Sequence, residues 1–236
     1  MTPPDLISDM AEVARQLDPP TDAVGRVIQF IALRSGDGVS TLARAFAQAV
    51  SIKAGRGVWL VELDVLSGVQ AHAIAAQPDL FGKLGPAVSA SPDGTCFFRI
   101  TSPNPDSGVT DASCLVAHAV GPHRMWVTRF RNAALGPGQA VEMRDTGEYW
   151  EALRGHADWV VVDAPPLERS GAGLVTAGHV DGNILVLDAS RGDLAADAVL
   201  RDRVLNAGGR VAGAVLNRAP GDIAYSRGVD PERRRR

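Results

Sequence analysis

The sequence contains very little lysine and very little cysteine. Lys53 and Lys83 are the only lysines among 236 residues, so arginine supplies nearly all of the positive charge. Cys96 and Cys114 lack the paired spacing of a zinc site or a disulfide framework, and the histidines show no metal-ligand spacing. A formal net charge of −3 argues against general nucleic-acid binding. The sequence thus excludes several common kinds of metal and nucleic-acid protein.

Long apolar runs are absent as well. No run reaches the length needed to cross a membrane, and the first residues carry neither the basic nor the apolar region of a signal peptide. We therefore expect a cytoplasmic protein, brought to a membrane only by a partner.

The 236 residues, of which 45% are hydrophobic, suit one α/β domain with short appendages. We expect an N-terminal helix and linker over 1–23, the main domain over 24–220 and a basic flexible tail over 221–236. Within the first part, apolar side chains recur at helical spacing over 6–17, which predicts an amphipathic helix. Two interpretations stay open: the helix packs on the flank of the domain, or it forms a contact with a partner or a second copy.

Continuous apolar runs alternate with helical segments along the main domain. This pattern favours an α/β fold, a doubly wound and mostly parallel sheet covered on both faces, in three layers as in P-loop NTPases. Strands are predicted at 27–33, 58–64, 158–163, 182–188 and 211–217, and helices at 40–54, 146–154 and 193–206. The region 66–122 is harder to interpret; a strand at 96–101, a helix at 111–119 and a further strand at 125–128 are expected there and just beyond.

Residues 34–41 read Arg-Ser-Gly-Asp-Gly-Val-Ser-Thr, between a predicted strand and a predicted helix. Gly36 and Gly38 allow the backbone to curl around an anion at the positive end of the helix. In a nucleotide-hydrolysing loop, Val39 would be a lysine. The sequence alone leaves two interpretations open: a phosphate-binding loop without its cation, or a turn whose serine and threonine cap the helix.

Polar side chains stand at the ends of the predicted strands: Glu62 and Asp64, Asp163, and Asn217. In open parallel sheets, ligands bind outside the carboxyl ends of the strands. Carboxylate and hydroxyl oxygens suit Mg²⁺, and an asparagine amide suits the edge of an adenine. The alternative is that each acid caps the next helix.

With these motifs the chain resembles the MinD/ParA-like deviant P-loop ATPases. Within them it is most similar to the cytoplasmic domain of the bacterial tyrosine kinases of capsule and exopolysaccharide systems. The resemblance spans roughly 24–220 and rests on the segments 35–43 (SGDGVSTLA), 58–64 (VWLVELD), 158–166 (DWVVVDAPP) and 211–218 (VAGAVLNR).

The resemblance implies a role for each matching residue. Ser40, Asp64 and Asp163 would hold Mg²⁺, and Glu62 would join the two aspartates as the catalytic acids. ATP or ADP would be the cofactor if a nucleotide binds; binding of none stays open. The nucleotide-binding residues would be Arg34, Gly36, Asp37, Gly38, Val39, Ser40, Thr41, Asn217 and Arg218.

Four departures from the family pattern all weaken kinase chemistry. Val39 replaces the lysine that neutralises phosphate charge, and Tyr225 stands alone where the kinases carry a tyrosine cluster. The oligomerisation motif of the kinases is only half kept in 12–18, and Val65-Leu66 replaces the expected Leu-Arg after the acidic motif. Arg34, at the place of the second lysine of the deviant loop, is a candidate replacement cation.

Three hypotheses follow. The preferred one is a degenerate tyrosine-kinase-like protein, catalytically impaired, that acts as the cytoplasmic partner or regulator of an inner-membrane polysaccharide chain-length or export protein. The second is an active ATPase or tyrosine kinase completed by Arg34 or by a basic residue of a partner. The third is a MinD/ParA-type positioning ATPase whose tail, Arg233–Arg236, touches anionic lipid. A homo-oligomer is compatible with each, and nucleic acid is not an expected partner.

Overall fold

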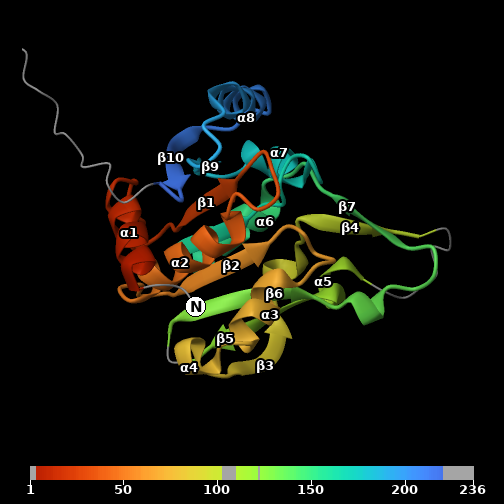
Figure 1. Ribbon diagram of the computed structural model, residues 1–236. Helices are drawn as coiled ribbons and strands as arrows, with labels where there is room; N and C mark the ends of the chain where they lie inside the picture. The colour runs from red at the N-terminus through yellow and green to blue at the C-terminus, as the bar shows by residue number, and fades with distance from the viewer. Residues whose placement is uncertain (1–3, 103–109, 122, 220–236) are drawn as a thin grey trace, which may run out of the picture.

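The computed structural model describes residues 4–102, 110–121 and 123–219, with a large twisted sheet at its centre (Figure 1). Tyr225 and Arg233–Arg236 lie outside the described residues. The main sheet has the order β10 (Val211–Asn217), β9 (Gly182–Asp188), β1 (Arg26–Ile31), β8 (Trp159–Asp163), β2 (Val58–Glu62), β6 (Met125–Phe130), β5 (Leu115–Val120), β3 (Leu84–Ser89). A second, two-stranded sheet pairs β4 (Phe98–Thr101) with β7 (Ala140–Met143).

Helices cover both faces of the main sheet, which makes three layers. One hydrophobic cluster joins one face to α1 (Pro4–Arg15), α2 (Val39–Ser51), α3 (Val69–Ala75) and α4 (Pro78–Phe81). The other joins the opposite face to α6 (Glu148–His156), α7 (Ala172–Ala177) and α8 (Leu194–Asn206). Two 3₁₀ turns, Pro92–Gly94 and Asn132–Ala134, and the short α5 (Asp111–Cys114) complete the described elements. The predicted fold class, α/β with a mostly parallel sheet, is confirmed.

The central strands are apolar on both sides because both sides are covered. In β1, Val27 and Ile31 lie in one hydrophobic cluster, whereas Ile28 and Phe30 lie in the other. The parallel register sets Phe30 beside Asp163, so the loop after β1 and the acid at the end of β8 meet at one edge of the sheet. This edge of the sheet is therefore the place where the order of strands and polar residues in the sequence predicts a ligand site.

The helix predicted over 111–119 is wrong. The helix ends at Cys114, and Leu115–Val120 is strand β5, antiparallel to β6 and to β3. Leu115 and Ala117 are buried while Val116 is half-buried, which is the alternation of a strand. Pairing with two strands distant in sequence, rather than local propensity, decides the structure here. The strands β3 and β7 were not predicted.

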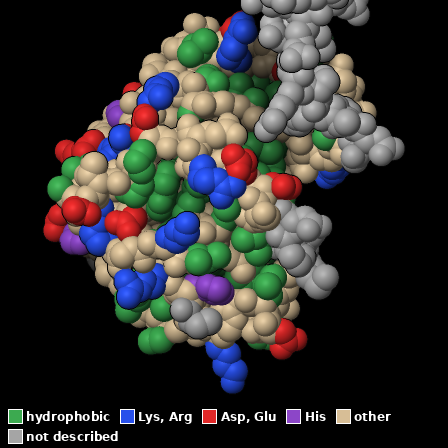
Figure 2. Space-filling view, turned by 90° about the vertical axis from the view of Figure 1, so that its left-hand side faces the viewer, with side chains coloured by type: hydrophobic (Ala, Val, Ile, Leu, Met, Phe, Trp, Pro, Cys, Tyr) green, Lys and Arg blue, Asp and Glu red, His purple; other side chains and the backbone are tan. Residues whose placement is uncertain are grey.

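The predicted N-terminal helix is present as α1 and packs against α2, with Met10 fully buried between them. Hydrophobic side chains gather on this face of the molecule among charged ones (Figure 2). Near the end of α2, Ile52 leaves 70% of its surface exposed beside a groove of about 560 Å³. Among the described residues, no helix is long and apolar enough to span a membrane.

Candidate nucleotide-binding site

The loop between β1 and α2 has the geometry of an anion cradle. Gly36 and Gly38 adopt positive φ angles of 84° and 104°, which turn the backbone into the first turn of α2. Within the described residues, the backbone N–H groups of residues 36–40 donate to no acceptor. Five consecutive free donors at a helix N-terminus form the site that binds phosphate in P-loop proteins.

Asn217, predicted to face adenine, lies against this loop. Its amide Nδ2 donates to the carbonyl oxygen of Asp37 at 2.8 Å. A Cβ added at Gly38 would lie 2.2 Å from the same nitrogen, so only glycine fits there. The end of β10 thus fixes the shape of the loop, a role that the sequence did not indicate.

Val39 is the first residue of α2 and leaves only 7% of its surface exposed. Its side chain belongs to the hydrophobic cluster beneath the helix. No cation therefore extends from this position toward the cradle. A carboxylate lies close by instead, because Glu168 accepts from the backbone N–H of Ser35 at 2.6 Å.

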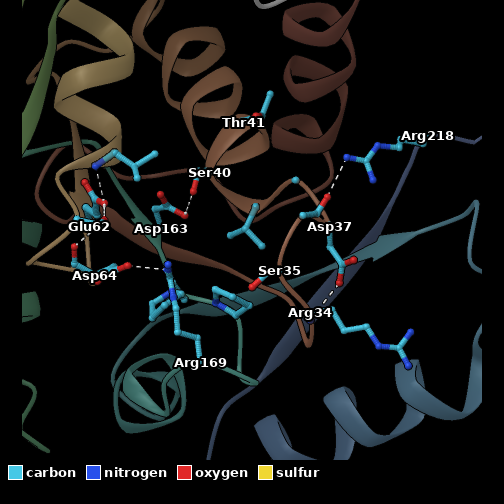
Figure 3. Close-up of a pocket in the computed structure, with 18 residues that line it drawn as sticks. Arg34, Ser35, Asp37, Ser40, Thr41, Glu62, Asp64, Asp163, Arg169 and Arg218 are labelled. Atoms are coloured by element: carbon cyan, nitrogen blue, oxygen red, sulfur yellow. Dashed lines mark hydrogen bonds and ion pairs between the residues drawn. The ribbon is translucent and has the colours of Figure 1, made fainter.

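Asp163 and Ser40 come together as the family resemblance implies (Figure 3). The Ser40 hydroxyl donates to Asp163 at 3.1 Å, and the Gln70 amide donates to the other carboxylate oxygen at 2.6 Å. Burial raises the pKa of Asp163 to about 7, against these hydrogen bonds, which favour the charged form. Near neutral pH this acid is therefore only partly ionised.

Glu62 caps a helix rather than standing free in the site. One of its oxygens accepts from the Ser67 hydroxyl at 2.5 Å and from the backbone of Val69 at 2.9 Å. The other accepts from the backbone of Gln70 at 3.0 Å. These contacts hold the N-terminus of α3, which is the alternative role left open for the strand-end acids.

Asp64 lies past the end of β2 and pairs with Arg169 at 2.6 Å (Figure 3). Arg169 comes from the loop after β8, and sequence reasoning missed it. An arginine shortly after the Asp-Ala-Pro-Pro segment was the available signal. It is a cation on the acidic side of the cleft, although Asp64 already uses it.

A buried arginine behind the acids was also missed. Arg44 lies one turn along α2 from Ser40 and donates to Gln70 at 2.9 Å. Gln70 in turn links Arg44 to Asp163 and donates to the Ser40 carbonyl at 2.8 Å. Burial lowers the pKa of Arg44, while the nearby charges of Asp163 and Glu62 oppose this shift. Gln70 thus connects Arg44 to Asp163 by hydrogen bonds, and the charge of Arg44 lowers the pKa of Asp163.

Arg34 extends away from Ser40 and Asp163, toward α8 (Figure 3). Its guanidinium lies 2.6 Å from Asp193, which also caps α8 by accepting from Ala196. The ion pair with Asp193 raises the pKa of Arg34. In this structure, the candidate replacement cation is engaged elsewhere.

Arg218 and Arg191 hold the loop from its outer side. Arg218 donates to the Gly36 carbonyl at 2.8 Å and pairs with Asp188 at 2.6 Å. Arg191 lies 3.5 Å from Asp37 and 3.4 Å from Asp188. The Ser190 hydroxyl and Arg218 lower the pKa of Asp188 to about 2. The Arg218 side chain thus holds the loop from outside, by its hydrogen bond to the Gly36 carbonyl oxygen.

The cradle and the acids together line a cleft of about 390 Å³, the size range of small-ligand sites. The predicted residues that line it are Arg34, Gly36, Asp37, Gly38, Val39, Ser40, Thr41, Glu62, Asp64, Asp163 and Arg218. Within the described part of the chain, no three histidine, cysteine or acidic side chains group as a ready metal site. Mg²⁺ held by Ser40, Asp64 and Asp163, as the resemblance implies, would take waters or phosphate oxygens as its other ligands.

Comparison with known proteins finds a similar sequence and several similar solved structures. No family model matches the chain. A segment of 86 residues is 30% identical to "Putative tyrosine-protein kinase CapB" of Staphylococcus aureus, covering 36% of this chain and 38% of that protein.

Three solved structures share the fold over most of their length. The VpsO kinase domain is 17% identical, with a TM-score of 0.53 over 83% of this chain and 86% of that one. The chimerical protein CapA2B2 is 15% identical, with a TM-score of 0.54 over 90% and 82% of the two chains. MinD of Pyrococcus horikoshii, solved with Mg-ADP, is 15% identical, with a TM-score of 0.54 over 86% and 72%.

The chain shares its fold with MinD and with the bacterial tyrosine kinase domains, and a glycine-rich loop follows its first strand as in the expected P-loop. The resemblance to bacterial tyrosine kinases of the CapB kind is confirmed by both comparisons. The matched segment spans little more than a third of CapB, so the activity of that protein does not transfer with the resemblance.

Proposed function

We propose that this chain is a nucleotide-binding relative of the bacterial tyrosine kinases in which phosphoryl transfer is impaired. It would act as a cytoplasmic partner or regulator of capsule or exopolysaccharide synthesis and export. The observation that carries the proposal is the cradle of free N–H groups at residues 36–40 next to a buried valine at position 39. The loop keeps the means to bind a phosphate and lacks the charge that stabilises its transfer.

Phosphoryl transfer depends mainly on positioning and charge stabilisation. Loss of one such cation costs a few kcal/mol of transition-state stabilisation, about a hundredfold or more in rate. Binding suffers less, since the backbone donors and the helix N-terminus remain. Because the MinD structure contains Mg-ADP, ADP with Mg²⁺ is the ligand to test first.

An active enzyme completed by Arg34 is the alternative. It requires Arg34 to leave Asp193, at 2.6 Å, and to turn toward the cleft. A partner that competes for Asp193 would release it. The Asp64–Arg169 pair offers a second cation that nucleotide binding could redirect.

The partner part of the proposal draws on the resemblance to CapB and to the chimerical protein CapA2B2. An inner-membrane chain-length or export protein would bring the chain to the membrane. The hydrophobic groove beside α1 and the exposed Ile52 are available for such a contact.

Calorimetry with ADP and ATP in the presence of Mg²⁺ tests the binding step. Wild type should bind without measurable turnover, and Val39→Lys should bind at least tenfold more tightly. Val39→Met is the matched control, since it adds length without charge and should bind as wild type does. Failure of both wild type and Val39→Lys to bind would remove the nucleotide part of the proposal.

Turnover tests the impairment. Hydrolysis of ATP by wild type at the rate of an intact kinase domain would contradict impaired transfer and favour the alternative. In that case Arg34→Ala should abolish turnover, and an unchanged rate would exclude Arg34 as the replacement cation.

A further inference from the structure

A second cleft adjoins the nucleotide cleft, with Ser67 in the wall of both. It has a volume of about 480 Å³, and its lining residues come from the start of α3, from β6, β5 and β3, and from the segment after β6. Figure 1 shows these helices and strands in one part of the molecule. Its lining residues are Ser67, Gly68, His72, Ala87, Val116, His118, Arg129, Phe130, Arg131, Asn132 and Ala133. It opens beside the carboxyl end of β6, which runs parallel to β2, so it lies at the ligand-binding edge of the sheet.

The charge of this second cleft is of one sign, whereas both acids and arginines line its neighbour. Two arginines and two histidines line it, and no acidic side chain does. The whole chain, by contrast, carries 27 acidic residues against 24 basic ones. A cavity lined by charges of one sign concentrates ligands that carry the opposite charge.

The guanidinium groups of this cleft are largely unused. Within the part of the chain that the structure describes, Arg129 has no hydrogen-bond acceptor or acidic partner. Arg131 makes one long hydrogen bond, 3.5 Å to the carbonyl oxygen of Ser113. Every other cleft-facing arginine described above pairs with an acid or donates to Gln70. A free guanidinium group can form bidentate hydrogen bonds with a phosphate or a carboxylate group.

The histidines add hydrogen-bond acceptors. The Nδ1 atoms of His72 and His118 lie 2.7 Å and 2.9 Å from the carbonyl oxygens of Gly68 and Gly85. A carbonyl only accepts, so Nδ1 carries the hydrogen in each ring and a neutral ring leaves Nε2 free to accept. Such acceptors suit the hydroxyl groups of a ligand.

We propose that this cleft binds a small hydroxylated anion, either a sugar phosphate or a sugar acid. Arg129 and Arg131 would hold the phosphate or carboxylate, and His72 and His118 would accept from hydroxyl groups. The volume fits one sugar with its charged group. This site does not depend on nucleotide binding, because none of the four side chains belongs to the phosphate loop.

Calorimetry on the full chain tests the proposal with three probes: glucose 1-phosphate, glucuronate and neutral glucose. At least one anion should bind, and glucose should bind at least tenfold more weakly. Binding of glucose 1-phosphate alone would identify a phosphate site, and binding of glucuronate alone a carboxylate site.

Variants locate the binding. Arg129→Gln and Arg131→Gln should each weaken it at least tenfold, whereas Arg201→Gln, an exposed arginine on α8 paired with Asp202, should leave it unchanged. Because Arg129 and Arg131 are exposed, we expect both variants to fold as wild type does, and thermal melting checks this. Histidine ring resonances should shift on titration with the bound anion, a readout that the phosphate loop does not provide.

Two results would overturn the proposal. One is the absence of binding by either anion. The other is binding that survives both arginine variants but disappears in Gly38→Ala, which would place the anion in the phosphate loop. The nucleotide proposal has separate readouts in Val39→Lys and turnover, so each proposal can fail without the other.

Discussion

Two clefts share Ser67 in their walls, yet they offer an anion different surroundings. The first is lined by acidic side chains and by arginines that pair with acids, and its capacity for phosphate comes from backbone N–H groups. The second contains no acid, and its capacity comes from arginine side chains. The comparison teaches that the carboxyl edge of a sheet provides the place for a ligand, while the local side chains and loop geometry decide its chemistry.

The largest effect on ligand binding is expected when the backbone cradle alone is altered. Gly38→Ala places a Cβ 2.2 Å from Asn217 Nδ2 at a φ of 104°, so the loop must change shape. We expect nucleotide affinity to fall by about a hundredfold, roughly 2.7 kcal/mol, as the donors lose alignment. Anion binding in the second cleft should be unaffected. Calorimetry with both ligands measures the two effects.

Gly155→Ala is the matched control for that substitution. Gly155 lies within α6, and a Cβ added there meets nothing within 4 Å. The change should leave both clefts intact and stabilise the helix by about 0.5–1 kcal/mol. Loss of nucleotide binding in this variant would show that the Gly38 effect is not local.

The next test concerns the buried acid of the first cleft. The pKa of Asp163 is about 7 in the folded protein against 3.8 for an ordinary aspartate. Protonation at this site therefore stabilises the fold fully below pH 4, and that contribution is lost as the pH rises through 7. Asp163→Asn should gain stability relative to wild type across this window, by on the order of 4 kcal/mol at most.

Chemical unfolding of the metal-free protein at pH 4, 6 and 8 measures this difference. Arg129→Gln, in the second cleft, is the control, because arginine stays charged throughout this range. A difference between wild type and Asp163→Asn that does not change with pH would contradict the raised pKa.

A smaller effect is expected from the buried arginine behind Asp163. The charge of Arg44 lowers the pKa of Asp163, so Arg44→Met should raise that pKa further. The pH window in which Asp163 loses its proton would then move upward. A carboxyl NMR titration measures the shift, with Arg201→Met as the control. A lower pKa of Asp163 in Arg44→Met would show that Arg44 acts otherwise.

The smallest effect is expected at the outer side of the loop. Asp193→Asn keeps a side chain that caps α8 but removes the charge that holds Arg34. The melting temperature should change little, whereas release of Arg34 toward the cleft should strengthen nucleotide binding severalfold. Asp193→Ala should lower the melting temperature more, because the cap is lost as well. Equal nucleotide affinity in wild type and Asp193→Asn would leave Arg34 without a role in the cleft.

Prediction from the sequence succeeded where the local residue pattern sets the structure. The apolar strands β1, β8 and β9 were predicted because their residues face a core on both sides. The loop at 34–41 was found because glycine spacing between a strand and a helix leaves few alternatives. The helix predicted over 111–119 failed because β5 owes its structure to partners distant in the sequence.

For the candidate site, the sequence identified residues but not what they contact. It gave no sign that Asn217 packs against Gly38 or that Arg34 pairs with Asp193, since these partners lie more than 150 positions away. It also missed Arg44 and Arg169, of which only Arg169 had a signal, its place shortly after the Asp-Ala-Pro-Pro segment. The second cleft has no sequence signal, because its arginines, histidines and serine come from separate elements.

The sequence by itself determined the α/β class, the glycine-rich loop between a strand and a helix, and the presence of valine rather than lysine at position 39, because each follows from residue type and local spacing. Only the tertiary structure decided which side chains are free to act. Glu62 became a helix cap, Arg34 was held by α8, and Arg129 remained without a described partner. The physical reason is that charge and hydrogen-bond capacity are shared among neighbours in space, and β-sheet pairing sets those neighbours across the whole length of the chain.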